Sequence, residues 1–168
     1  MGTEVRFTPI GIVHRKASDD EVTSGTPRLE SEIEIYQQYQ DALEGLEGFS
    51  HVFVVGYFHK LRPEQIGPLK VRPKRLVRYG LKLEDLPLIG DFALDSPTRP
   101  NPIGLSLVRL LRIEEGRRLL VQDLDFFDGT PVLDIKPYQP GYRSDAFSLP
   151  RWHMELTRKM DLPPTFPA

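Results

Sequence analysis

The chain has 168 residues, a formal net charge of −2 and 39% hydrophobic residues, which suits one soluble domain with a core of its own. No apolar run approaches the ~20 residues of a membrane span and no signal-peptide pattern opens the chain, so we expect a cytoplasmic protein. The absence of cysteine excludes disulfides, thiolate nucleophiles and cysteine-ligated metals, and the net charge gives no overall signal for nucleic acid.

The first half of the chain predicts strands separated by polar segments. Apolar and alternating residues favour strands at 6–15, 32–36 and 52–58. Residues 16–29 are polar and predict a long loop, whereas 39–46 predicts a short helix of about two turns. Because 52–58 is apolar on both faces, we expect it to be a central strand, or one covered by a partner subunit.

The second half predicts further strands and a closing helix. Strands are predicted at 69–76, 86–94, 105–113, 119–124 and 132–135. An apolar stripe over 149–160 predicts a C-terminal helix, lying on the strands or on a second subunit. Six or seven strands without βαβ alternation favour a mainly β protein, a small antiparallel β-barrel with a short helix and a C-terminal helix. We place the barrel domain at 1–145, and the helix with its proline-rich tail at 146–168.

A proline-rich loop at 95–106 is the most restrained stretch of the sequence. Its three prolines enclose Arg99 and Asn101, and each proline fixes its own φ and restricts the residue before it. A loop ordered in advance loses less entropy when it binds a ligand. A functional loop is therefore the preferred interpretation, with a rigid corner between strands as the alternative.

A basic segment lies between the two predicted halves. From residue 60 to residue 82 it holds one acid, Glu64, and one aromatic residue, Tyr79. Its cations could bind a phosphate backbone while Tyr79 stacks on a base, or they could form a solvated face. The residues predicted to bind nucleic acid are Lys70, Arg72, Lys74, Arg75 and Tyr79.

The histidines give no support to a metal site. His51 and His59 stand at the two ends of one predicted strand, roughly 26 Å apart, which is too far for one ion. We therefore expect no metal, and His59 could either touch a ligand or be satisfied at the barrel rim. Next to the last turn, Phe126 and Phe127 lie between two aspartates, where we expect both rings to need cover from a ligand or partner.

Three blocks of the sequence resemble the signatures of the TsaA-like (TrmO) family. They are GFSH at 48–51 leading into YFH at 57–59, SPTRPNPIGLS at 96–106, and DGTPVLDIKPY at 128–138. The resemblance implies a small β-barrel that binds S-adenosylmethionine, usually as a homodimer with the cofactor near the subunit interface. Characterised members methylate N6 of threonylcarbamoyl-adenosine at position 37 of tRNA, beside the anticodon.

The resemblance also implies site residues. Those carried over to the cofactor are Phe58, His59, Asp95, Arg99, Asn101, Leu105, Asp125, Phe126, Phe127, Asp128, Gly129 and Thr130. Asp95 stands where the family has an arginine for the cofactor carboxylate, so it must turn away, meet the cofactor's amine or mark a changed ligand. Asp128 and Tyr138 are the catalytic candidates for handling the proton on N6. Two alternatives stay open: the same fold methylating another substrate, or a non-catalytic dimeric binding module.

Overall fold

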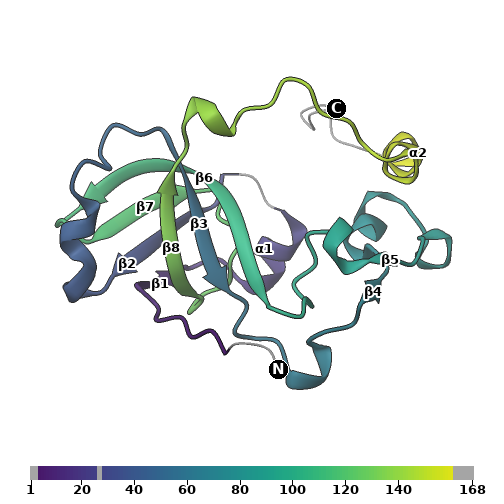
Figure 1. Cartoon of the computed structure of the whole chain (residues 1–168), viewed down its shortest axis with the longest axis horizontal. Coiled ribbons are helices and arrows are strands. Elements are labelled where there is room, and N and C mark those ends of the chain that lie inside the picture. The colour runs from purple at the N-terminus through teal and green to yellow at the C-terminus, as the bar shows by residue number, and fades with distance from the viewer. Residues whose placement is uncertain (1–3, 26–27, 161–168) are drawn as a thin grey trace.

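Six antiparallel strands close into a barrel in the computed structural model, which describes residues 4–25 and 28–160 (Figure 1). Around the barrel the order is β1-β2-β7-β6-β3-β8, so each strand is paired on both sides. The strands are β1 (Gly11–His14), β2 (Glu30–Ile35), β3 (His51–Tyr57), β6 (Ile103–Glu114), β7 (Arg118–Gln122) and β8 (Pro131–Pro137). The predicted mainly β class is confirmed, and the antiparallel barrel, predicted with six or seven strands, has six.

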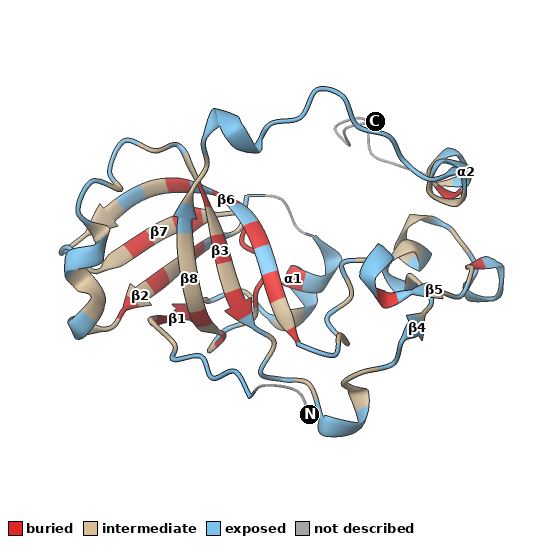
Figure 2. Ribbon diagram, viewed as in Figure 1, coloured by how far each residue is buried: buried red, intermediate tan, exposed pale blue. Residues whose placement is uncertain are grey.

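Buried residues recur along the strands, as the colouring of Figure 2 shows, and their side chains form the core of the barrel. On β3, Val52 and Val54 point inward and are fully buried, whereas Phe53 and Val55 lie half-buried on the outside. β3 pairs with both β6 and β8, as expected of a central strand, although closure of the barrel gives all six strands two neighbours. The first strand is shorter than predicted, and Gly11 within it passes so near β2 that an added Cβ would lie 2.3 Å from the Glu34 carbonyl oxygen.

One end of the barrel is closed by an aromatic ring set against two glycines. Gly56 of β3 pairs in register with Gly104 of β6, and the buried Phe126 ring lies over both. A Cβ added at Gly56 would lie 2.5 Å from Phe126 Cε2, and one at Gly104 would lie 2.7 Å from Phe126 Cε1. Phe58 meets the same ring edge-on, with centroids 5.8 Å apart. We call this end of the barrel the rim.

The prediction of a long loop at 16–29 is wrong, because α1 (Asp19–Ser24) forms there. The Ser18 hydroxyl accepts from the Glu21 amide at 3.3 Å, and the Glu21 carboxylate accepts from the Ser18 amide at 2.9 Å. This capping box satisfies amides that would otherwise lack partners at the helix start. The Ser-x-x-Glu signal was present in the sequence. The predicted helix at 39–46 is the 3₁₀ segment η1 (Gln37–Leu43).

Residues 61–100, which we call the satellite, form an insertion between β3 and β6 (Figure 1). Its elements are η2 (Pro63–Gln65), β4 (Lys70–Val71), η3 (Lys74–Tyr79), η4 (Leu83–Asp85), β5 (Ile89–Gly90) and η5 (Asp91–Ala93). The strands predicted at 69–76 and 86–94 are therefore wrong apart from one two-residue pairing. Prolines at 68, 73 and 87 explain this, because each removes a ladder donor and restricts its neighbour.

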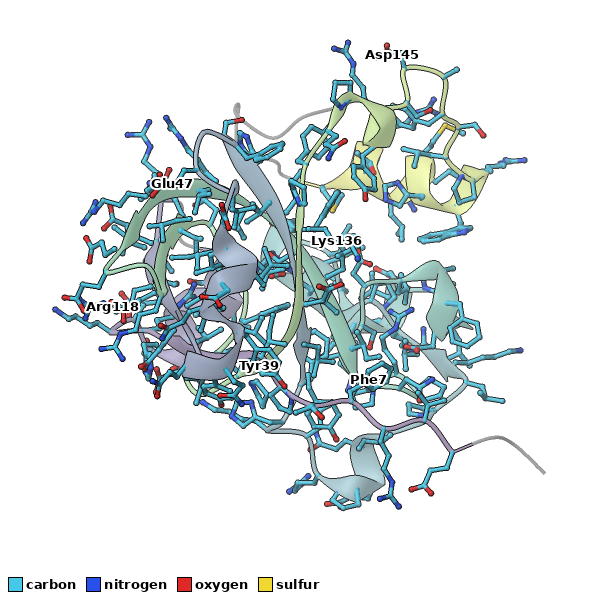
Figure 3. All side chains as sticks on the ribbon, turned by 60° about the vertical axis from the view of Figure 1, so that its left-hand side comes forward. Phe7, Tyr39, Glu47, Arg118, Lys136 and Asp145 are labelled. Atoms are coloured by element: carbon cyan, nitrogen blue, oxygen red, sulfur yellow. The ribbon has the colours of Figure 1, made fainter. Side chains whose placement is uncertain are left out.

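The C-terminal helix is confirmed as α2 (Arg151–Lys159), which follows η6 (Pro140–Tyr142) and a fully exposed connection. In Figures 1 and 3 it lies beside the satellite and away from the barrel wall. None of the helices in the described part of the chain has the length and apolar character needed to cross a membrane. The predicted tail at 161–168 lies outside the described residues, and the division at residue 145 stays a prediction.

We predict that Gly56→Ala destabilises the protein by about 1–3 kcal/mol, because the new methyl group must displace the Phe126 ring in a packed interior. Urea unfolding of the two proteins measures this difference. Gly90→Ala is the matched control, since its Cβ meets no atom within 4 Å. Equal stabilities for the Gly56→Ala and Gly90→Ala proteins would contradict the proposed closure of the rim.

Candidate functional site

The rim collects most of the residues that the sequence assigned to a cofactor. The end of β3 and the start of β6 meet here, where the Phe58 amide donates to the Pro102 carbonyl oxygen at 2.8 Å. The loop before β8 joins them, since the Phe126 ring lies against Gly56 and Gly104, and its Gly129 amide also donates to the Val13 carbonyl oxygen of β1 at 2.9 Å. Three segments far apart in the sequence, 58–60, 101–105 and 125–130, are thereby brought together.

His59 is the titratable ring at the rim. A Cβ at Gly129 would lie 3.6 Å from its Nε2 atom, and Gly129 has the positive φ of 77° that favours glycine. Burial, followed by the positive charge of Lys60, lowers the pKa of His59 below its ordinary value, although the carboxylates of Asp19 and Asp128 oppose the shift. The imidazole is therefore neutral near pH 7, when one ring nitrogen can accept a proton.

Lys60 connects the rim to α1 and was not singled out from the sequence. Its ammonium donates to both carboxylate oxygens of Asp19, at 2.9 and 2.7 Å, and lies 5.0 Å from the centre of the Phe127 ring. This fixes a positive charge beside His59 and covers one face of Phe127. No local motif could have revealed the pair, because 41 positions separate its two residues.

Arg15 holds the loop that carries Asp128, and sequence reasoning also missed it. Its backbone amide donates to Asp128 Oδ1 at 2.8 Å, and its guanidinium donates to the Ser31 hydroxyl at 2.8 and 2.6 Å and to the Leu124 carbonyl oxygen. Burial lowers the pKa of this guanidinium, against the attraction of Asp125. Arg15 thus ties β1, β2 and the loop before β8 into one rigid unit.

The proline loop is restrained by its own hydrogen bonds as well as by its prolines. Arg99 Nη1 donates to the carbonyl oxygens of Leu94 and Ser96, at 2.7 and 3.4 Å, and the Ser96 and Thr98 hydroxyls lie 2.8 Å apart. Arg99 therefore serves the loop itself, and its contact with a cofactor stays a prediction. Asp95 is exposed at the start of this loop, and so is Asn101 near its end.

The two predicted catalytic residues do not meet within one chain. Asp128 lies at the rim before β8, whereas the Tyr138 amide donates to the His51 carbonyl oxygen at 3.0 Å, beyond the other end of the strand. Seven residues of strand separate them, or roughly 20 Å. Tyr138 instead stacks on Tyr142, with ring centroids 6.2 Å apart. The two side chains cannot act on one reacting atom in a single subunit.

We expected the rings of Phe126 and Phe127 to need cover from a ligand or partner, and this prediction is wrong for Phe126. The Phe126 side chain is 1% exposed and belongs to the barrel core, so protein atoms cover it already. The reason is the room left by the two facing glycines, a pairing that spacing along the chain does not reveal. Only the backbone of Phe126 could reach a ligand, while Phe127 stays half-buried at the rim.

The residues predicted to bind nucleic acid lie in the satellite, and some of them contact other protein groups while others are exposed. Arg72 Nη1 donates to the Leu86 carbonyl oxygen, and the Arg78 guanidinium lies 4.9 Å from the centre of the Tyr79 ring. One face of Tyr79 is thus covered by a neighbour. Lys74 and Arg75 are exposed on η3, and Lys70 is exposed on β4, so these three remain accessible to a ligand.

Two further observations concern alternative sites. Within residues 4–25 and 28–160, no three His, Asp or Glu side chains gather closely enough to hold a metal ion. A shallow, open hollow of about 370 Å³, lined by residues 47–50 and 110–113, lies at the end of the barrel opposite the rim. The residues that line it belong to none of the three segments that meet at the rim, so we place the candidate site at the rim.

Known proteins are similar to this chain in sequence and in fold. Residues 20–144 match the family described as "tRNA-methyltransferase O N-terminal domain". A "Probable S-adenosyl-L-methionine-binding protein" of Methanothermobacter thermautotrophicus is 41% identical over 147 residues, which are 86% of this chain and 97% of that protein. The "tRNA (adenine(37)-N6)-methyltransferase" of Escherichia coli is 35% identical over 144 residues, or 80% of this chain and 58% of that enzyme.

A solved structure agrees with these relatives. "Crystal structure of TrmO" superposes with a TM-score of 0.64 at 34% identity, covering 87% of this chain and 64% of the solved one. The chain thus spans less than two thirds of that solved protein and of the Escherichia coli enzyme, which carry further residues.

We predict that Lys60→Gln raises the pKa of His59, because the variant removes a neighbouring positive charge and frees Asp19. Because the pKa of His59 is lower in the folded protein than in the unfolded chain, the unfolded chain binds a proton first as the pH falls. The free energy of unfolding therefore decreases as the pH falls below about 6.5, the ordinary pKa of histidine. The variant should therefore lose less stability on acidification. Histidine titration by NMR measures the midpoint, with Lys136→Gln on the outside of β8 as control. An unchanged His59 midpoint would refute the coupling.

Proposed function

This chain belongs to the tRNA-methyltransferase O N-terminal domain family, and we propose that it is an S-adenosylmethionine-dependent methyltransferase acting on N6 of adenosine-37 in tRNA. The finer substrate we propose is threonylcarbamoyl-adenosine at that position, in a cytoplasmic setting. The observation that carries the proposal is the convergence at one rim of the segments 58–60, 101–105 and 125–130.

The residues at the rim fit such a cofactor. Leu105 is 66% exposed on β6 and offers an apolar contact, while Phe127 and Phe58 supply partly accessible rings. Because Gly129 has no side chain, a ligand bound beside His59 could approach the backbone at this position closely. Asp95 and Asn101 add exposed polar groups from the restrained loop. An apolar wall with a few fixed polar groups is the usual form of a small-molecule site.

The cofactor supplies an activated methyl group when bound, and the chain supplies position and a proton acceptor. The nitrogen at N6 loses a proton in the reaction, so a base is needed within reach of the rim. Asp128 is our candidate, because the Arg15 amide holds one of its oxygens in place. His59 stands beside it as a neutral ring that can pass the proton on. Tyr138 could contribute only from a second subunit.

We predict that the purified protein transfers methyl groups from S-adenosylmethionine to tRNA bearing threonylcarbamoyl-adenosine. Mass spectrometry of digested tRNA should show the modified nucleoside gaining 14 Da, the mass of a methylene group. Asp128→Asn should reduce the rate by about 10²–10⁴-fold if Asp128 takes the proton, whereas Asp41→Asn on η1 should not. Calorimetry separates the alternatives. Cofactor binding without tRNA methylation would indicate another substrate, and no binding at all would indicate a non-catalytic module.

We also propose a homodimer, formed through the outer face of β3 and β6. Leu105 and Leu107 are 66% and 46% exposed there, and they pair in register with Val55 and Phe53. The result is a sheet that is apolar on both sides, next to the rim. A second copy would remove this row from water, at about 25 cal/mol for each Å² buried. A twofold axis would place the same patch on both subunits.

Sedimentation velocity tests the homodimer. We predict a dimer for the native protein and a monomer for Leu107→Lys, since the variant places a charge in the centre of the proposed interface. Leu83→Lys is the control, because Leu83 is similarly exposed, at 44%, but lies in the satellite. A native protein that stays monomeric at tens of micromolar would overturn this part of the proposal.

A further inference from the structure

Two basic segments, separated by about seventy positions, lie side by side in the structure. Residues 65–83 of the satellite contain six lysines and arginines and no aspartate or glutamate. Helix α2 contains three lysines and arginines, Arg151, Arg158 and Lys159, with Glu155 as its one acid. In both Figure 1 and Figure 3, α2 lies alongside the satellite, so the charges that the sequence keeps apart are brought to one side of the molecule.

The charged groups of this surface differ in availability. In the satellite, Arg72 and Arg78 donate to backbone carbonyl oxygens, whereas Lys70, Lys74, Arg75 and Lys82 are exposed. On α2, Arg151 is paired with Glu155 at 2.7 Å, while Arg158 and Lys159 are exposed in the last turn. Arg158 and Lys159 are therefore placed to meet an external anion.

Acidic residues border this surface. Glu84 and Asp85 come two and three positions after Lys82, and both are exposed. A partner with extended negative charge, such as a phosphate backbone, would be attracted by the cations along η3 and α2. The two carboxylates of η4 would repel it. The satellite also emerges from the rim, because it joins the end of β3 to the start of β6. The insertion that carries these cations is thus anchored at the candidate site at both of its ends.

We propose that α2 and the satellite together form one binding surface for the phosphate backbone of RNA, with Arg158 and Lys159 as the contribution of α2. This inference rests on the proposed function for the identity of the RNA, and it adds a second segment to the single one expected from the sequence. Helix α2 lies outside residues 20–144, the part of the chain that matches the family.

The test measures tRNA binding by the full chain as a function of salt, without any methylation step. Arg158→Gln combined with Lys159→Gln should weaken binding about tenfold at 0.1 M salt and reduce the slope of log K against log salt by about 1.5. Lys74→Gln combined with Arg75→Gln should produce a similar change. The matched control, Arg112→Gln with Lys136→Gln, alters net charge equally but lies on the barrel.

The outcomes separate the two proposals. If the α2 variant binds tRNA with native affinity and slope while the satellite variant is weakened, the inference fails and the proposed function stands. If the native chain neither binds nor methylates tRNA, the RNA substrate fails as well. Calorimetry with S-adenosylmethionine and circular dichroism show whether each variant keeps its fold. If the native chain binds phosphatidylserine vesicles and the α2 variant does not, while tRNA binding is the same for both, then α2 contacts a lipid surface and the inference is overturned.

Discussion

The ring of Phe126 can close the barrel only because Gly56 and Gly104, facing each other across β3 and β6, present no Cβ to it. A methyl group at either position would lie within 2.7 Å of that ring, in an interior with no room to spare. The closure brings the loop before β8 against the end of β3, where His59 and Gly129 become neighbours. A steric requirement of the core thus sets the position of the candidate site.

Electrostatics then defines the properties of that rim. Lys60 is held by Asp19 of α1, and Arg15 holds Asp128 through its backbone amide, so each charged group beside His59 has a fixed position. Burial and the Lys60 charge keep the imidazole neutral. A ring held neutral next to an anchored carboxylate suits proton transfer during methylation, which needs an acceptor close to the reacting nitrogen. The capped helix α1 contributes by holding Asp19 beside Lys60, although none of its residues is proposed to take part in the reaction.

The satellite begins and ends at the same rim. Because β3 ends and β6 begins at adjacent points, an insertion of forty residues can leave and return there without disturbing the barrel ladder. Its prolines prevent long strands, so short 3₁₀ turns present cations on an irregular surface. Helix α2 lies beside it and adds charge from the end of the chain (Figure 1). The candidate site and the proposed anion surface are therefore linked through this one insertion.

The sequence alone determined the mainly β class, the strands predicted at 52–58, 105–113 and 119–124, and the C-terminal helix, because alternation and turn residues act over a few positions. It also located the segments that meet at the rim. Tertiary structure decided the rest. It buried Phe126, placed Tyr138 at the opposite end from Asp128, and brought Lys60 to Asp19 and α2 to the satellite. These relations depend on strand register and barrel closure, which join residues whose separation along the chain carries no periodic signal.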